Sequence, residues 1–174
     1  MTRRAICIGL AASLALAACG ATTTTVTRSG PEKIRPDAGG IAIQNSDLRI
    51  DFGRAEAGAV EAVSRVLGAQ PQSRSVNTEC GAGPTTIVKY PQIDLLFLDG
   101  AFRGWVTQSN GTVTGNGLSP GVPRRQLAEG AYGPFRETSL GVEFETGGIF
   151  GLLPDGGADT PIELLWAGTS CFFR

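Results

Sequence analysis

Hydrophobic positions divide the chain into an apolar run, an unpatterned polar stretch and a patterned remainder. Residues 5–15 are apolar and carry no charge, and residues 21–46 show neither helical nor strand periodicity before Ile41. From Asp47 onward, apolar side chains recur at the spacings of strands and helices. The pattern therefore predicts that folding begins at Asp47, after a leader and a flexible Thr-, Pro- and Gly-rich tether.

The first folded elements are predicted to be a strand and an amphipathic helix. Apolar and polar residues alternate over 48–52, which is typical of a half-buried strand. Over 55–67 the apolar positions share one helical face, and Gly68 follows as a common helix end. The polar residues 70–83 are expected to form a loop.

Further strands are predicted by β-branched residues and turn signals. A strand is expected over 85–90, followed by a hairpin over 94–107 in which Asp99-Gly100 suits a tight turn. A second hairpin over 140–153 and a last strand over 162–167 follow the same pattern.

The two halves of this region share an order of elements. Pro123 is suited to the start of a shorter helix over 124–130, which precedes the second hairpin as the first helix precedes the first. We therefore predict an α+β fold of two repeats, residues 47–110 and 111–174, each running from a helix into an antiparallel sheet. Because each repeat is small, the two should pack as one domain with the helices on one face of the sheet.

The N-terminal run has the composition of an export signal. Arg3 and Arg4 precede residues 5–15, which at about 1.5 Å per residue span roughly half of a 30 Å membrane core. The following Leu16-Ala17-Ala18-Cys19-Gly20 resembles the lipobox of bacterial lipoproteins. In that family, cleavage precedes the cysteine and its sulfur is diacylated.

The lipobox resemblance implies how the chain is processed and where in the cell it is located. Residues 1–18 would be the signal peptide, Cys19 the lipidated N-terminus, and residues 19–46 the tether. Two acyl chains anchor a protein stably to a membrane, and Gly20 in place of Asp implies the outer membrane, facing the periplasm. An ordinary signal peptide with an incidental cysteine is the alternative.

A second resemblance concerns the repeated unit. A short helix ends at Leu67-Gly68 before Pro71, Tyr132-Gly133-Pro134 stands at the corresponding place, and strands follow each. This arrangement is similar to the β-lactamase-inhibitor-protein-like fold, which small lipoproteins of the outer-membrane barrel-assembly machinery share. The resemblance implies protein–protein contact through the sheet or loops, and it carries over no catalytic residue.

Composition removes several functional classes. The chain has no His, which excludes Ser-His-Asp and Cys-His nucleophiles and His-ligated zinc. Its 15 basic and 16 acidic side chains are too balanced for a nucleic-acid-binding protein, which would carry a basic stripe. We expect no cofactor, no metal site, no nucleic-acid partner and no enzymatic activity.

The 4 cysteines are expected to have different fates. Cys7 leaves with the signal peptide and Cys19 takes the lipid. Cys80 and Cys171 then remain in an oxidising compartment, where we predict that they form a disulfide. Two buried free thiols and a metal site made of two thiolates are the alternatives.

Two groups of side chains are candidates for function. Trp105 is interpreted by default as a ring that packs in the core or on the sheet. The alternative is a partner contact, in which Arg103, with Phe102 and Trp105 beside it, combines residue types that are enriched in protein–protein hot spots. Glu143 and Glu145 lie two apart on a predicted strand and so face one side, like the two carboxylates of a glycosidase, but the solvated face of a sheet explains them better.

The function that these observations favour is that of a non-enzymatic envelope lipoprotein, which binds or scaffolds another envelope protein. The alternative is a small-molecule binder or a His-free enzyme that uses a concavity of the sheet. A deep pocket with converging polar groups would favour the alternative.

Overall fold

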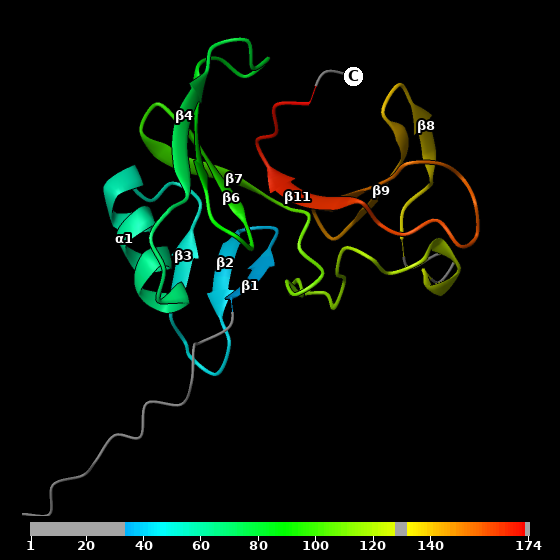
Figure 1. Cartoon of the computed structure of the whole chain (residues 1–174), viewed down its shortest axis with the longest axis horizontal. Helices are drawn as coiled ribbons and strands as arrows, with labels where there is room; N and C mark the ends of the chain where they lie inside the picture. The colour runs from blue at the N-terminus through cyan, green and yellow to red at the C-terminus, as the bar shows by residue number, and fades with distance from the viewer. Residues whose placement is uncertain (1–33, 128–131, 173–174) are drawn as a thin grey trace, which may run out of the picture.

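The computed structural model describes residues 34–127 and 132–172, and within them the fold is mostly β (Figure 1). The predicted signal peptide, Cys19 and the tether up to residue 33 lie outside the described residues. Nowhere in the described ranges is a helix long and apolar enough to cross a membrane. In chain order, the elements are β1 (Ile34–Asp37), β2 (Gly40–Ile43), β3 (Arg49–Asp51), α1 (Glu56–Leu67), β4 (Ser73–Asn77), β5 (Thr85–Lys89), β6 (Asp94–Leu98), β7 (Ala101–Thr107), the single 3-10 turn η1 (Arg124–Gln126), β8 (Arg136–Thr138), β9 (Gly141–Thr146), β10 (Ile149–Leu153) and β11 (Leu164–Gly168).

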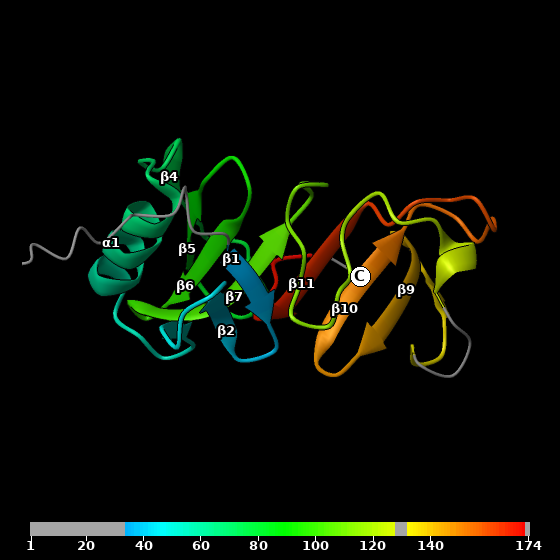
Figure 2. The same ribbon diagram turned by 90° about the horizontal axis from the view of Figure 1, so that it is seen from below.

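Eight strands form one continuous antiparallel sheet in the order β4-β5-β6-β7-β11-β10-β9-β8. Strands β4 to β7 come from the first half of the chain and β8 to β11 from the second. The halves meet where β7 pairs with β11, with Gly104 opposite Gly168 and Trp105 opposite Ala167. The remaining strands form a 3-stranded sheet in the order β1-β2-β3, which lies against the middle of the large sheet (Figure 2).

The predicted α+β fold of two helix-then-sheet repeats is wrong. Within the described residues only the first half carries an α-helix, and η1 stands at the start of the range 124–130 where the second was expected. Residues 128–130 of that range lie outside the described residues. The helical turn ends at Leu127, whose backbone is extended with φ −82° and ψ 104°. Arg124 N–H and Arg125 N–H bond to the carbonyls of Thr160 and Ala158 at 2.9 and 2.8 Å, which pairs the chain at η1 with the loop before β11.

Three strands lie where the sequence predicted a tether or a loop. Residues 34–46, assigned to the tether, include β1 and β2, and these strands place Ile34, Ile41 and Ile43 in the core. Folding therefore includes residues at least 13 positions before Asp47, since the described chain begins with a strand at Ile34. The polar residues 73–77, expected in a loop, form β4.

The helix and both hairpins are confirmed. α1 spans Glu56–Leu67, and Gly68 ends it in the left-handed conformation with φ 63°. Asp99 and Gly100 have φ values of 51° and 72°, as a turn with two left-handed residues requires. The second hairpin joins β9 to β10 in the expected place.

The main core lies between one face of the large sheet and a cover of α1 and the 3-stranded sheet. Ala59 and Val63 of α1 are fully buried against it. The indole N–H of Trp105 donates to the carbonyl of Asp37 at 2.8 Å, which fixes β1 onto β7. Arg49 of β3 holds the Asp37 carboxylate through two hydrogen bonds of 2.7 and 2.9 Å.

We predict that Gly104→Ala destabilises the protein by about 1–3 kcal/mol, because a Cβ at this position would overlap the backbone of Thr169. Gly81→Ala is the matched control, since a Cβ there meets nothing within 4 Å, and its effect should stay within about 1 kcal/mol. Urea denaturation of both variants measures the difference. Equal midpoints for the two variants would contradict the prediction.

Candidate functional site: a groove on the outer face of the sheet

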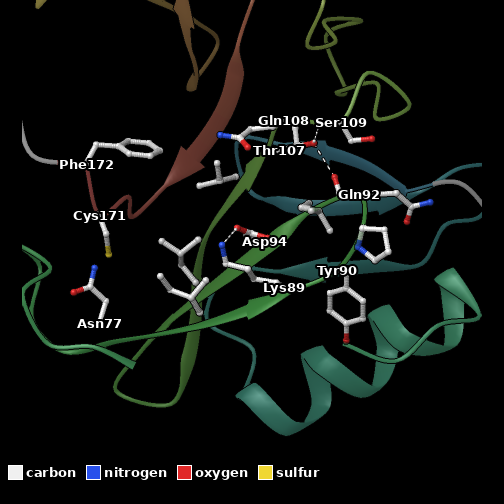
Figure 3. A pocket seen from close by; sticks show the side chains of 15 residues that line it. Asn77, Lys89, Tyr90, Gln92, Asp94, Thr107, Gln108, Ser109, Cys171 and Phe172 are labelled. Atoms are coloured by element: carbon white, nitrogen blue, oxygen red, sulfur yellow. Dashed lines mark hydrogen bonds and ion pairs between the residues drawn. The ribbon is translucent and has the colours of Figure 1, made fainter. Parts of the chain in front are cut away.

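The face of the large sheet turned away from α1, called here the outer face, carries a half-open groove of about 550 Å³ (Figure 3). Side chains alternate along each strand. The residues next to the buried Val88, Leu95 and Trp105 in their strands therefore point to this face. The groove floor is formed by β5, β6 and β7 and consists of Ile87, Lys89, Asp94, Leu96 and Val106.

An ion pair lies on the otherwise apolar floor. Lys89 and Asp94 are directly opposite in the β5–β6 register, and their Nζ and Oδ2 atoms are 3.5 Å apart. Burial raises the pKa of the Asp94 carboxyl, and the nearby Lys89 ammonium offsets that effect only in part. The groove thus offers one cation and one anion in a partly dehydrated place.

One wall of the groove is held by threonine hydroxyl groups. Thr107 and Thr112 both donate to the carbonyl of Gln92, at 2.7 and 3.0 Å, which ties the β5–β6 turn to the segment after β7. Gln108 and Ser109 line this side of the groove (Figure 3). The wall is therefore polar at its rim and rigid at its base.

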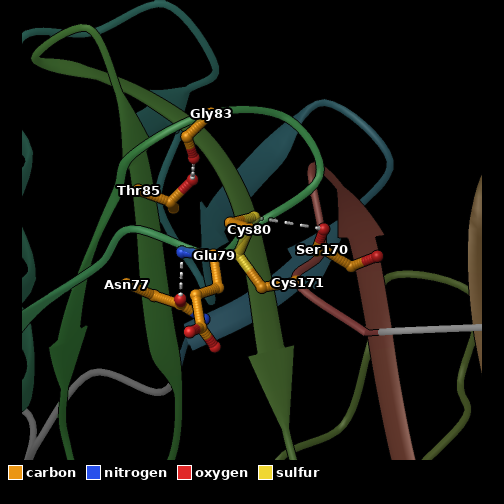
Figure 4. Close-up of a disulfide and its surroundings, with 7 residues drawn as sticks. All are labelled: Asn77, Glu79, Cys80, Gly83, Thr85, Ser170 and Cys171. Atoms are coloured by element: carbon orange, nitrogen blue, oxygen red, sulfur yellow. Dashed lines mark hydrogen bonds between the residues drawn. A yellow bond between two sulfur atoms is a disulfide. The ribbon is translucent and has the colours of Figure 1, made fainter.

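The opposite wall is the segment that follows β11. Thr169 N–H donates to the carbonyl of Arg103 at 2.8 Å, and the Sγ atoms of Cys171 and Cys80 lie at bonding distance, 2.14 Å (Figure 4). The pair forms the disulfide that the sequence predicted. It holds the segment against the loop between β4 and β5, and Cys171 thereby becomes part of the groove lining.

A small second hydrophobic cluster supports this wall. The ring of Phe172 meets Trp166 edge-on at 5.2 Å, and Trp166 stacks on Phe150 at 5.6 Å. Leu152 and Leu164 complete the buried part of the cluster. Both faces of the large sheet therefore bury apolar side chains, and the groove lies beside the smaller cluster.

The predicted contact residues of β7 lie in different places. Phe102 and Trp105 are 0% exposed, so the default interpretation of Trp105 as a packed ring is confirmed, and neither ring is available to a partner. Strict alternation would put these two residues on opposite faces, but a register shift opposite Leu96 and Phe97 makes Arg103 an extra residue. Both rings consequently enter the core, and Arg103 is exposed outside the groove lining.

The two glutamates of β9 are engaged locally. The Glu145 carboxylate accepts from Gly148 N–H in the β9–β10 turn at 2.6 Å. Glu143 is only 9% exposed and accepts from the Thr138 hydroxyl at 3.3 Å. The expected solvated face is therefore correct for Glu145 and wrong for Glu143.

The sequence contained a signal for the ion pair that was not used. Lys89 and Asp94 stand on either side of the turn at 90–93, so antiparallel pairing places their opposite charges side by side. Within residues 34–127 and 132–172, no group of three or more Cys, Asp and Glu is placed to hold a metal ion. The groove presents charged, amide, hydroxyl and apolar groups.

Comparison with known protein families, with curated proteins and with solved structures finds no match to this chain. The function proposed below therefore rests on the residues of this chain.

We predict that replacing both Cys80 and Cys171 by Ser lowers the free energy of unfolding by about 2–4 kcal/mol. The bond closes a loop of 91 residues, and a loop of that length loses much chain entropy when it is cross-linked. Urea denaturation of the oxidised protein and of the double variant measures the loss. A change under about 0.5 kcal/mol would show that the bond contributes no stability.

We also predict that Asp94→Asn stabilises the protein at neutral pH. Because burial raises the pKa of Asp94 above its usual 3.8, the folded chain binds this proton more tightly than the unfolded chain does. The wild type therefore loses stability as the pH rises from about 3.8 through the folded pKa. Urea midpoints of the two proteins should coincide at pH 3 and separate at pH 7; a separation equal at both values would contradict a charge effect.

Proposed function

We propose that this chain is a lipid-anchored protein of the bacterial cell envelope, and that its folded part binds another envelope protein without catalysing a reaction. The anchor is Cys19, and the membrane is the outer membrane on its periplasmic side. The observation that carries the binding role is the outer-face groove, whose two walls are fixed by hydrogen bonds and by a disulfide.

The location is supported by three features that agree. A basic, then apolar, leader precedes the lipobox-like residues 16–20. A disulfide between Cys80 and Cys171 suits an exported protein, because cytosolic thiols are kept reduced. The Thr- and Pro-rich residues between Cys19 and Ile34 give the folded part a reach beyond the lipid surface.

A protein partner is supported by the composition and openness of the groove. Its floor is apolar around one ion pair, while its rim carries amide and hydroxyl groups, an arrangement like the apolar centre and polar rim of protein interfaces. Burial raises the pKa of Asp94, and carboxyl groups with perturbed pKa values are concentrated at functional sites. The groove is half-open, so an extended polypeptide segment can lie along it.

A small molecule is the second candidate occupant. The volume of about 550 Å³ falls in the range of small-molecule sites. A zwitterion fits best, because Lys89 and Asp94 present both charges to it. The same experiment separates the two candidates.

The test places a photo-crosslinking residue at Gln108, on the groove rim, in intact cells that make the full chain. The same residue at Glu61 of α1, whose side chain is 70% exposed, is the control. We expect a discrete protein adduct from position 108. The adduct should be at least fivefold weaker when the crosslinking residue is at position 61, and when it is at position 108 in the Lys89→Glu variant.

The anchor is tested by metabolic lipid labelling and membrane fractionation. The chain should take up the lipid label and sediment with membranes, and Cys19→Ala should abolish both.

Each part of the proposal fails separately. Lipid label that persists in Cys19→Ala would overturn the anchor. Equal adducts from positions 108 and 61, or an adduct unchanged by Lys89→Glu, would overturn the groove as the partner site. No protein adduct, together with a metabolite that co-purifies with the wild type and is lost in Lys89→Glu, would favour the second candidate.

A further inference from the structure

Strand β4 is an open edge of the large sheet. It pairs with β5 on one side, and no strand of the described chain pairs with its other side. Residues 73–76 are all exposed, and Val76 is 53% exposed. Alternate residues of β4 thus direct backbone N–H and C=O groups to solvent, ready to pair with another strand.

The other edge of the sheet is protected by comparison. β8 has 3 residues, and Arg136 and Glu137 place both charge signs on it. Short, charged edges disfavour pairing with further chains. β4 has 5 residues and one charged side chain, Arg74, which is already bonded to Glu56 of α1 at 2.8 Å.

An apolar slot of about 360 Å³ lies beside this edge, between α1 and β4. Ala57 and Val60 of α1, Pro71 and Val88 line it, and the Arg74–Glu56 ion pair also borders it. Arg74 is opposite the buried Val88 in the β4–β5 register, so Arg74 and Val76 project to the side of the sheet that α1 covers. In Figures 1 and 2, β4 lies at the end of the sheet beside α1.

The sequence of β4 is complementary to itself in one register. If two copies pair antiparallel about Ser75, each Arg74 stands opposite Val76 of the other copy and each Ser73 opposite Asn77. No like charges face each other, and the aliphatic stem of each arginine covers an exposed valine. The same register brings each Val76 to the slot of the other copy. The contact between Val76 and the slot therefore occurs twice, as the symmetry of a twofold interface requires.

We propose that β4 pairs with β4 of a second copy of this chain, centred on Ser75, with Val76 of each copy inserted into the α1–β4 slot of the other. The pairing joins two eight-stranded sheets edge to edge. The slot opens on the side of the sheet opposite the outer-face groove, whose floor residues lie on β5, β6 and β7. Asn77, at the end of β4, also lines the groove, so the proposed interface adjoins the groove at this residue.

The test uses single cysteines in the full chain in intact cells, oxidised and analysed without reductant. Ser75→Cys should yield a disulfide-linked dimer, because position 75 faces itself across the axis. Ser73→Cys should not, because two copies of position 73 would be roughly 13 Å apart, beyond the reach of a disulfide. Glu137→Cys, on the exposed β8 edge, is the matched control.

Charge substitutions at Val76 test the side-chain register. Val76→Lys, placed opposite Arg74, should lower the yield of the Ser75→Cys dimer at least threefold. Val76→Asp loses the same apolar contact with the slot, but its attraction to Arg74 offsets part of that loss, so its dimer yield should stay above that of Val76→Lys. Since Val76 is exposed in the single copy, neither change should prevent folding, and an unchanged urea midpoint verifies this.

Three results would overturn the proposal. A Ser75→Cys dimer no stronger than that of Glu137→Cys shows that the edges do not meet. Equal dimers from positions 73 and 75 show a different register. An adduct of Ser75→Cys with another protein in place of the dimer shows that the edge receives a different chain.

Discussion

Gly104 and Gly168 lie opposite each other where β7 meets β11, and neither position has room for a side chain. A Cβ at Gly104 would overlap Thr169, and one at Gly168 would overlap the carbonyl of Arg103. This close backbone approach joins the two halves into one sheet, and the other features depend on it. The continuous sheet provides a single face for the core, and it directs the chain after β11 across the outer face toward Cys80. Without the pairing of β7 with β11, the segment after β11 would not be held beside the groove as its second wall.

One extra residue in β7 decides which side chains the two faces receive. Arg103 shifts the register, so that Phe102 and Trp105 both enter the core while Val106 reaches the groove. Trp105 then uses its indole N–H to hold the carbonyl of Asp37. The extra residue in β7 thus positions the small sheet and also shapes the groove floor. In a strictly alternating strand, Phe102 and Trp105 would point to opposite faces, and one of them would leave the core.

The features that were predictable from sequence are those with strong local causes. The apolar stripe of residues 55–67 and the Asp99-Gly100 turn depend on neighbouring residues, and both are present in the structure. β4 was missed because it is exposed on both sides and has no alternating pattern. β1 was missed because Pro36 and its polar neighbours have the composition of a linker, although a proline is tolerated in an edge strand.

The remaining errors come from contacts between distant residues. A local pattern predicted a helix at 124–130, but the chain there pairs with the loop near residue 160 and becomes extended at Leu127. The Cys80–Cys171 pair was predicted from an expected export to an oxidising compartment, whereas its role in a groove wall could be seen only in the fold. Lys89 and Asp94 are recognisable in the sequence as opposite charges flanking a turn, yet only the sheet shows that they lie on the floor of the groove.

The disulfide also divides the molecule mechanically. It closes a covalent ring that contains every strand from β5 to β11, while β1 to β3, α1 and β4 lie outside the ring. A pull between the proposed lipid anchor and a partner held in the groove would reach the described strands from the N-terminal side, at β1. Such a load would peel the small sheet, α1 and then β4 in order, and would stop at Cys80. The floor and walls of the groove lie mostly within the ring, so tension could strip the cover of the core before it separated the strands that hold the partner.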